Sequence, residues 1–376
     1  MTSAARKPFA IGVDLGGTKI LAAVVEVATG RVVSSAKKRT VDTSAFESIE
    51  GKPKDRFKDK TDTGEAKPKD KDKSKDHKDK AKDKDGGQLL LERVGDVVRE
   101  ALASAGPDFK LEDMGGIGFG VAGQVDREKG VLVAAPNLGV APQFPIQQLM
   151  EAEFKLPVAL GNDVEVATLG ELHFGSGQNC PNFICIFVGT GIGGGIVQDG
   201  IPYRGATNTA GEVGHIVVAA GGRYCGCGGR GHLEAYCSRT AITRSILAEL
   251  HRGRPSIVRE QLPPGILPDP NTATSVAIRS KAIARALAAN DELVIEITNE
   301  AAEYLAYGLA SVINLYNPQR IILGGGLIEA VDPFFERVVK TTKQEALGVP
   351  AASIEIVRTK LGDFSGVVGA ALLSPH

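Results

Sequence analysis

The sequence predicts an α/β fold with two similar lobes that face each other across a cleft. At 376 residues the chain exceeds the roughly 250–300 residues that one hydrophobic core usually serves, and 43% of its residues are apolar. A pattern of strand, Gly-rich loop and strand begins at Phe9 and begins again at Phe183, about 174 residues later. This duplication predicts two related halves, and two facing halves create a cleft.

Apolar runs and their breaks predict the elements of the first half. Residues 9–33 give three strands that are separated by turns containing glycine. Residues 89–105 carry apolar side chains at helical spacing. The further expected elements are strands at 116–121 and 157–160 and a helix at 164–174.

The second half repeats the opening pattern and then adds helices. Residues 183–205 again give strand, Gly-rich loop, strand, turn and strand. The elements expected after them are a long helix at 290–316, a strand at 320–323, a helix at 333–347, a strand at 354–357 and a helix at 366–373.

These elements suggest how the chain is divided. We expect an N-terminal lobe of residues 1–50 and 88–140, and a C-terminal lobe of residues 141–359 that includes a metal-binding loop at 211–234. The C-terminal segment 360–376 should pack back on the N-terminal lobe as a helix.

An insertion at residues 51–87 interrupts the N-terminal lobe. Positions 52–85 hold 14 basic and 10 acidic side chains, and only Phe57 among them could join a core. Such a segment buries too little apolar surface to offset the entropy of ordering it, so we expect it to be disordered.

Composition argues against several kinds of partner. The formal net charge of −1 gives no attraction for nucleic acid or for an anionic membrane, and no window approaches the about 18 uninterrupted apolar residues of a membrane span. The N-terminus leads into a strand rather than a signal peptide, and five cysteines, an odd number, argue against a disulfide framework. We expect a cytoplasmic protein that binds neither nucleic acid nor membrane.

Three Gly-rich loops, each after an apolar strand, predict a nucleotide site. Adjacent glycines let backbone N–H groups approach a ligand, and amides, a hydroxyl and an ammonium suit a polyphosphate. One loop alone is more often a plain turn, so the prediction depends on all three. Asp14, which ends the first strand, is placed to hold Mg²⁺. The candidate cofactor-binding residues are Asp14, Gly16, Gly17, Thr18 and Lys19, then Thr190, Gly191, Gly193 and Gly194, and finally Gly324, Gly325 and Gly326.

Asn162 and Asp163 lie between a short strand and a helix. Asp and Asn are common helix caps, and a carboxylate at the end of a strand also suits a catalytic base. The residues alone leave both roles open for Asp163.

The densest group of metal-ligating residues is His215, Cys225, Cys227 and His232. Two thiolates and two imidazoles suit tetrahedral Zn²⁺, and four protein ligands leave no open position, which predicts a structural site. Glu212 and Glu234 flank this group and would be positioned by it. The remaining cysteines are interpreted as small buried apolar residues: Cys180, Cys185 and Cys237.

Eight motifs follow one another along the chain: DLGGTK at 14–19, GVAG at 120–123, PNLG at 136–139, GND at 161–163, GTGIGGG at 189–195, GEVGH at 211–215, CGCGGRGHLE at 225–234 and LGGGL at 323–327. In their order and spacing, these motifs resemble the ROK group of bacterial sugar kinases and repressors, within the actin-like or hexokinase (ribonuclease H-like) ATPase fold. The resemblance covers nearly everything outside the insertion. One departure is His232, where the family usually has a third cysteine.

The resemblance implies roles for single residues. Asp163 would be the general base that takes the proton from the sugar hydroxyl. The first two loops would hold the ATP phosphates, and the third would border the adenosine. The implied sugar ligands are Asn137, Asn162, Glu212, Glu234 and His215, which would also bind zinc through its other ring nitrogen.

The implied activity is phosphorylation of a hexose at its 6-hydroxyl, with glucose the favoured substrate, ATP, Mg²⁺ and structural Zn²⁺ as cofactors, and a homodimer as the assembly. Fructose, N-acylmannosamine or another hexose, and polyphosphate as the donor, are alternatives. The rival class is a sugar-responsive repressor or a catalytically silent sensor. Repressors of this group carry a helix-turn-helix domain ahead of the first loop, where this sequence has only about ten residues, so a kinase is favoured.

Overall fold

The computed structural model describes residues 7–40, 86–135, 138–262, 265, 267–272 and 278–374. Asn137 and nearly all of the predicted insertion lie outside the described residues. The predicted end of the insertion at Gly87 is too late, because helix α2 (Gly86–Ser104) already includes Gly86 and Gly87.

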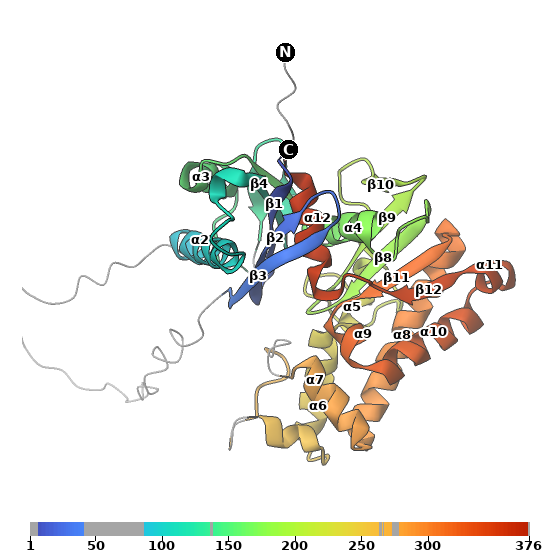
Figure 1. Cartoon of the computed structure of the whole chain (residues 1–376). Helices are drawn as coiled ribbons and strands as arrows, with labels where there is room; N and C mark the ends of the chain where they lie inside the picture. The colour runs from blue at the N-terminus through green and yellow to red at the C-terminus, as the bar shows by residue number, and fades with distance from the viewer. Residues whose placement is uncertain are drawn as a thin grey trace, which may run out of the picture.

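The first of two five-stranded sheets has the strand order β3-β2-β1-β4-β7 (Figure 1). The first three strands form an antiparallel meander, and β4 and β7 continue the sheet parallel to β1. Carboxyl ends of parallel strands meet at one edge of a sheet, where ligands bind in open α/β folds. The strands are β1 (Phe9–Leu15), β2 (Lys19–Glu26), β3 (Arg31–Arg39), β4 (Met114–Val121) and β7 (Val158–Asn162).

The second sheet repeats this arrangement with the order β10-β9-β8-β11-β12. Strands β8, β9 and β10 again form an antiparallel meander, and β11 and β12 continue the sheet parallel to β8. The predicted duplication is therefore confirmed, and it extends beyond the hairpin to the whole sheet. The strands are β8 (Phe183–Val188), β9 (Ile192–Gln198), β10 (Ile201–Tyr203), β11 (Arg320–Gly324) and β12 (Glu355–Arg358).

The lobe boundary predicted between residues 140 and 141 is too early. Strand β7 lies beyond that boundary, yet it pairs with β4 in the first sheet, from Ile117↔Val158 to Val121↔Asn162. Helix α3 (Ile146–Phe154), which packs on β7, therefore also belongs to the first lobe. A small two-stranded sheet of β5 (Gln124–Asp126) and β6 (Val131–Ala134) adjoins it.

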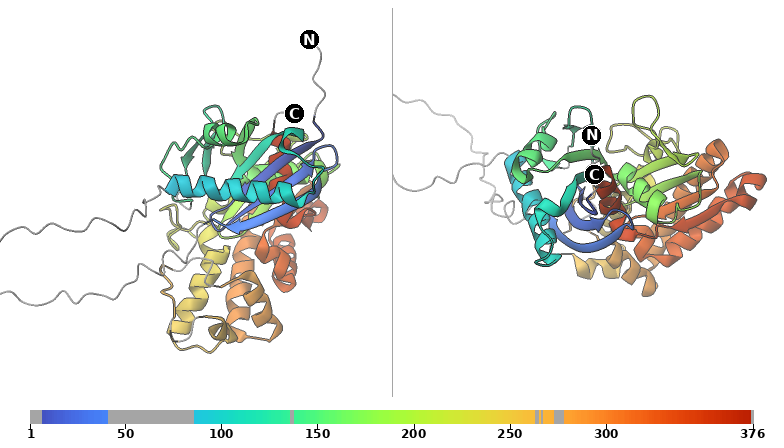
Figure 2. Two further views of the ribbon diagram at one scale, coloured as in Figure 1. Left: turned by 60° about the vertical axis from the view of Figure 1, so that its left-hand side comes forward. Right: turned by 45° about the horizontal axis from the view of Figure 1, so that its top comes forward.

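Two helices lie between the sheets: α4 (Asp163–Phe174) and α12 (Ser365–Leu373) (Figures 1 and 2). Helix α12 packs on β1 and β4, and α4 packs on both α12 and β9. These two helices thus join the lobes. The remaining helices are α5 (Glu234–Cys237), α6 (Arg239–His251), α7 (Ser280–Ala288), α8 (Glu292–Tyr316), α9 (Gly326–Ala330), α10 (Asp332–Glu345) and α11 (Gly348–Ser353).

Strand alternation in β1 explains how the first sheet is covered on both faces. Ile11 and Val13 point into a core with Val94 of α2, whereas Ala10 belongs to the smaller cluster that contains Val367 of α12. Glycine lets α12 approach the sheet backbone, since a β-carbon on Gly118 would lie only 1.7 Å from the Ala370 carbonyl oxygen. The last helix is therefore held tightly against the first lobe.

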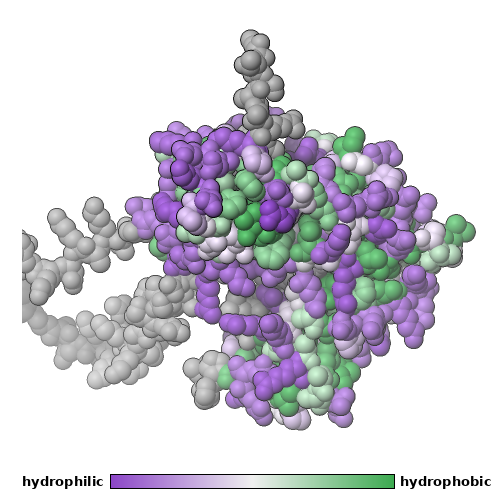
Figure 3. Space-filling view, in the orientation of Figure 1, coloured by the Kyte–Doolittle hydropathy of each residue, from purple (hydrophilic) through white to green (hydrophobic). Residues whose placement is uncertain are grey.

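In the view of Figure 3, hydrophilic residues and apolar patches lie side by side on the surface. Apolar residues reach the surface at the tip that α11 forms, where Val349 is 85% exposed. No helix in the described part of the chain is long and apolar enough to cross a membrane.

Candidate active site

Two carboxylates meet at the carboxyl edge of the first sheet. Asp14 of β1 is aligned with Gly120 of β4, Gly120 is aligned with Gly161 of β7, and Asp163 follows β7 directly. Burial, and then the charge of Asp14, raise the pKa of Asp163 to about 7. Burial raises the pKa of Asp14 to about 6, although the Lys19 ammonium opposes this shift. The edge therefore carries two half-buried carboxyl groups that change charge near neutral pH.

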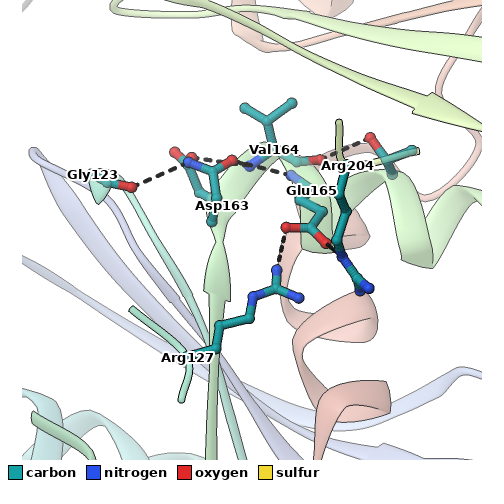
Figure 4. A network of polar contacts seen from close by, with 8 residues as sticks. Gly123, Arg127, Asp163, Val164, Glu165 and Arg204 are labelled. Carbon is teal, nitrogen blue, oxygen red and sulfur yellow. Dashed lines mark hydrogen bonds and ion pairs between the residues drawn. The ribbon is translucent and has the colours of Figure 1, made fainter. Parts of the chain in front are cut away.

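The first turn of α4 separates the roles of Asn162 and Asp163. Asn162 is the N-cap: its Oδ1 accepts hydrogen bonds from the backbone N–H groups of Val164 (3.0 Å) and Glu165 (3.2 Å). Its Nδ2 donates to the Gly123 carbonyl oxygen (3.3 Å), a contact visible in Figure 4. Because Asn162 caps the helix, the Asp163 carboxylate is not required for that task.

An ion network that the sequence did not reveal lies beside this turn (Figure 4). Glu165 pairs through one oxygen with Nη2 of Arg127, from the turn between β5 and β6, and through the other with Nε of Arg204, after β10 (2.7 Å). Burial and the charge of Arg204 lower the pKa of Arg127, which Glu165 opposes. Glu165 thus holds together two arginines from different lobes.

The first Gly-rich loop is a hairpin that other residues tie in place. Gly16, Gly17 and Thr18 connect β1 to β2, and Thr40 Oγ1 donates to the Gly16 carbonyl oxygen (2.6 Å). Lys19 Nζ lies 3.0 Å from Asp363 Oδ1, just before α12. A phosphate at this loop would therefore compete with Asp363 for Lys19.

The second Gly-rich loop is shorter than predicted. Residues 189–191 connect β8 to β9, whereas Gly193 and Gly194 lie inside β9. A β-carbon on Gly193 would lie 2.5 Å from Val164 Cγ2 of α4, so helix packing accounts for this glycine. Thr190 is held by α6, since Thr240 Oγ1 donates to its carbonyl oxygen (2.7 Å).

The third loop lies against the second one. Gly325 has a φ of +93°, and a β-carbon there would lie 2.5 Å from the Val188 carbonyl oxygen, so only glycine fits. Gly324 ends β11, and Gly326 opens α9. Gly326 faces Ser280, whose Oγ is buried and has no hydrogen-bond partner among the described residues. This buried hydroxyl marks a place where a ligand can supply the missing partner.

The predicted metal ligands come together in the structure. One ligand atom from each of four residues lies within 4.8 Å of the others: His215, Cys225, Cys227 and His232. Two contacts define the pairs, with Cys225 Sγ 3.7 Å from His215 Nδ1 and Cys227 Sγ 3.2 Å from His232 Nδ1. Such separations fit zinc, whose bonds to sulfur and nitrogen are about 2.3 and 2.0–2.1 Å.

One flanking glutamate connects this group to the second sheet, and the other lies near enough to Asp163 for its charge to act there. Glu234 Oε2 accepts the Ile192 N–H at the start of β9 (2.9 Å), while its Oε1 is 3.6 Å from Cys225 Sγ. Glu212 Oε2 lies 3.8 Å from His215 Nε2, the nitrogen that faces away from Cys225. The charge of Glu212 also contributes to the raised pKa of Asp163, so these two carboxylates border one space.

Comparison with known proteins identifies the family. The sequence profile of the ROK family matches residues 72–376. The chain belongs to the ROK family. It is similar to the glucokinase of Halalkalibacterium halodurans, with 32% identity over 291 residues that make up 77% of this chain and 84% of the relative. It is also similar to the N-acetylglucosamine repressor of Escherichia coli, with 29% identity, across 75% of this chain and 66% of the repressor.

Solved ROK structures confirm the predicted two-lobed actin-like fold. A ROK family glucokinase from Streptomyces griseus, in complex with glucose and AMPPNP, superposes with a TM-score of 0.71 at 27% identity, covering 97% of this chain and 99% of that one. The ROK hexokinase from Thermus thermophilus gives a TM-score of 0.66 at 27% identity, with 97% of each chain covered. Within the ROK family, these likenesses support a sugar kinase, although the family also contains repressors.

Proposed function

We propose that this ROK protein is an ATP-dependent hexokinase that transfers the γ-phosphoryl group of ATP to the 6-hydroxyl of glucose. The observation that carries the proposal is Asp163, a half-buried carboxylate with a pKa of about 7 that lies beside Asp14 at the edge of the first sheet and borders the same space as Glu212. Similarity to glucokinases, one of them in complex with glucose and AMPPNP, supports the choice of sugar and donor.

Asp163 acts as the general base in this proposal. A base works best when its pKa lies near the working pH, because it is then both available and strong enough to take a proton. The Asp163 carboxylate accepts the proton of the sugar hydroxyl as that oxygen attacks the γ-phosphorus. The departing ADP oxygen takes the bonding electrons, so the step is an in-line transfer that depends on positioning.

Polar side chains around Asp163 orient the sugar. Glu212 and His215 offer an acceptor and a ring nitrogen at the same space, and Glu234 completes this side. Asn162 uses one amide N–H for Gly123, which leaves the other N–H for a sugar oxygen. Asn137 is proposed as a ligand from its motif alone. An analogue that lacks one of the hydroxyl groups would leave buried polar groups of the site unpaired. Because this costs binding free energy, the site selects against such analogues.

The three Gly-rich loops hold ATP in this proposal. The first loop and Thr190 would contact the phosphates, and Gly326 with the unpartnered Ser280 hydroxyl would border the adenosine. Asp14 is the residue that would hold Mg²⁺, which usually binds one or two carboxylates together with phosphates and waters. When bound, this ion neutralises charge on the phosphates.

A structural zinc ion would stabilise the sugar side. The four ligands, two thiols and two imidazoles, fit the ion, and each flanking glutamate lies within three residues of one of them. The metal would fix the backbone of this loop rather than take part in the reaction.

A panel of sugars crossed with phosphoryl donors tests the proposed function. Glucose, fructose and N-acylmannosamine, each with ATP or polyphosphate, are assayed for the sugar phosphate. The highest kcat/KM is expected for glucose with ATP. A purified protein that binds glucose but turns over no pair would contradict the kinase and would favour a non-catalytic sensor, as in the repressor relatives.

A further inference from the structure

Glu171 of α4 is a buried carboxylate to which the proposed reaction assigns no role. Its side chain is fully buried, and no ion pair among the described residues includes it. Instead both oxygens accept two hydrogen bonds each. Oε2 accepts from Ser176 N (2.7 Å) and Lys360 N (3.1 Å), and Oε1 accepts from Leu361 N (3.0 Å) and Ser365 Oγ (2.7 Å). A buried carboxylate without a cation requires such complete satisfaction.

Most of these donors belong to the segment that crosses between the lobes. Lys360 and Leu361 follow β12 of the second sheet, and Ser365 opens α12, which packs on the first sheet. Figure 2 shows α12 between the two sheets. Glu171 therefore fixes the crossing segment, residues 360–365, to α4.

The crossing segment contacts the first Gly-rich loop at two points. Asp363, within the segment, pairs with Lys19 at 3.0 Å. Next to the segment, a β-carbon on Gly366 would lie 3.2 Å from Asp14 Cγ, so α12 begins directly against this carboxyl group. A shift of the segment would move the partners of both Lys19 and Asp14.

We propose that Glu171 is a positioning residue for the nucleotide, because it holds residues 360–365 in the place that sets Asp14 and Lys19. The inference rests on the proposed kinase function and adds a residue that touches neither substrate. Glutamine replaces the carboxylate only in part: with its oxygen in the place of Oε2, its NH₂ group would face the Leu361 N–H and lose that bond, while the Ser365 hydroxyl could accept from it and donate to the Gly362 carbonyl oxygen. Misplacement of about 1 Å far from the chemistry can cost about 100-fold in rate.

Asp291 provides a matched control. This buried carboxylate in the second lobe also accepts from a hydroxyl and backbone N–H groups: Ser256 Oγ (2.7 Å), Ile257 N (2.8 Å) and Val294 N (3.1 Å). It caps α8, and none of its hydrogen bonds within the described part of the chain involves residues 360–365. Asp291→Asn should therefore lower the melting temperature without changing the affinity for the nucleotide.

The experiment measures ligand affinity without turnover. In Glu171→Gln, the calorimetric Kd of AMPPNP with Mg²⁺ and the KM for ATP should rise by about 10- to 100-fold, while the Kd of glucose stays close to that of wild type. Asp291→Asn should leave all three values unchanged. Ser365→Ala, which removes one of the four hydrogen bonds, should change the nucleotide affinity in the same direction but by less. If Glu171→Gln does not fold, the nucleotide affinity of Ser365→Ala tests the inference instead.

Two results would overturn the inference. One is a Glu171→Gln or Ser365→Ala variant that loses stability but keeps wild-type affinity for AMPPNP, as Asp291→Asn should. The other is an equal loss of affinity for glucose and for AMPPNP, which indicates general damage. Failure of the wild type to phosphorylate any sugar would contradict the kinase proposal alone, because nucleotide affinity is measured without the reaction.

Discussion

The two sheets share one strand order, but their corresponding loops carry different chemistry. With the offset of 174 residues, Asp14 corresponds to Val188 and Lys19 corresponds to Gly193. The first sheet thus ends in charged groups, with Asp163 beside Asp14. The second sheet ends in backbone groups, the Thr190 hydroxyl and closely packed glycines. Gly193 packs against α4, and Gly325 packs against Val188.

This difference indicates how a duplicated scaffold acquires an active site. Both copies keep the hairpin and the parallel strands because these form the cores. The strand ends carry different side chains, and α4 and α12 lie between the two sheets. In our proposal the first copy supplies the base, while the second supplies the metal-supported sugar ligands and part of the nucleotide site.

The largest expected effect comes from removing the base in the first copy. Asp163→Asn keeps the size of the side chain but cannot accept the hydroxyl proton, so kcat should fall by at least about 10²-fold. Glucose affinity by calorimetry should persist. Near-normal turnover would show that the carboxylate is not needed and would remove the proposed asymmetry between the copies.

Thermal melting separates this effect from damage to the fold. The folded pKa of Asp163, about 7, exceeds its ordinary value of 3.8, so ionisation of this group lowers wild-type stability as the pH rises from about 4 to about 7. Asp163→Asn removes that loss. The melting temperature of Asp163→Asn minus that of wild type should therefore be larger at about pH 8 than at about pH 5.

Much of this arrangement could be predicted from the sequence, because its signals are local. Apolar strands before Gly-rich loops marked both hairpins, and the spacing of His215, Cys225, Cys227 and His232 marked a group that the fold brings together. The sheet to which β7 belongs could not be predicted, since a short apolar strand carries no information about its partner.

Other misses concern contacts between distant segments. In the sequence, the glycines of β9 predict a ligand loop, but glycine also occurs where a helix packs closely, as α4 packs through Val164 on Gly193. Glu171 and its partner Lys360 are 189 residues apart, and Glu165 and Arg127 are 38 apart. No periodicity or motif relates such pairs, so only the structure reveals them.

The next largest effect concerns the zinc site that we propose in the second copy. Cys227→Ser should lose zinc and raise the KM for glucose by about 10- to 100-fold, with the KM for ATP less affected. His232→Cys should retain the metal, because it restores the ligand usual in the family. Elemental analysis that finds about one zinc per chain in His232→Ala, with unchanged glucose affinity, would exclude His232 as a ligand.

The smallest effect concerns the ion network that joins the copies. Glu165→Gln leaves Arg127 and Arg204 without their shared carboxylate, which should cost about 1 kcal/mol of unfolding free energy for these partly exposed groups. Turnover should change only by a small factor. The control is Glu355→Gln, which breaks the Arg320 pair within one sheet and should change neither stability nor turnover measurably. A Glu165→Gln variant as inactive as Asp163→Asn would place Glu165 in the chemistry.

The pH dependence of kcat/KM for glucose tests the central claim most directly. This parameter reports the pKa values of the essential acid and base in the free enzyme. If Asp163 is the base, kcat/KM should fall about tenfold per pH unit below its pKa of about 7 and level off above it. A profile that stays flat from about pH 8 down to about pH 5, with saturating coupling enzymes, would contradict the assignment of Asp163 as the base.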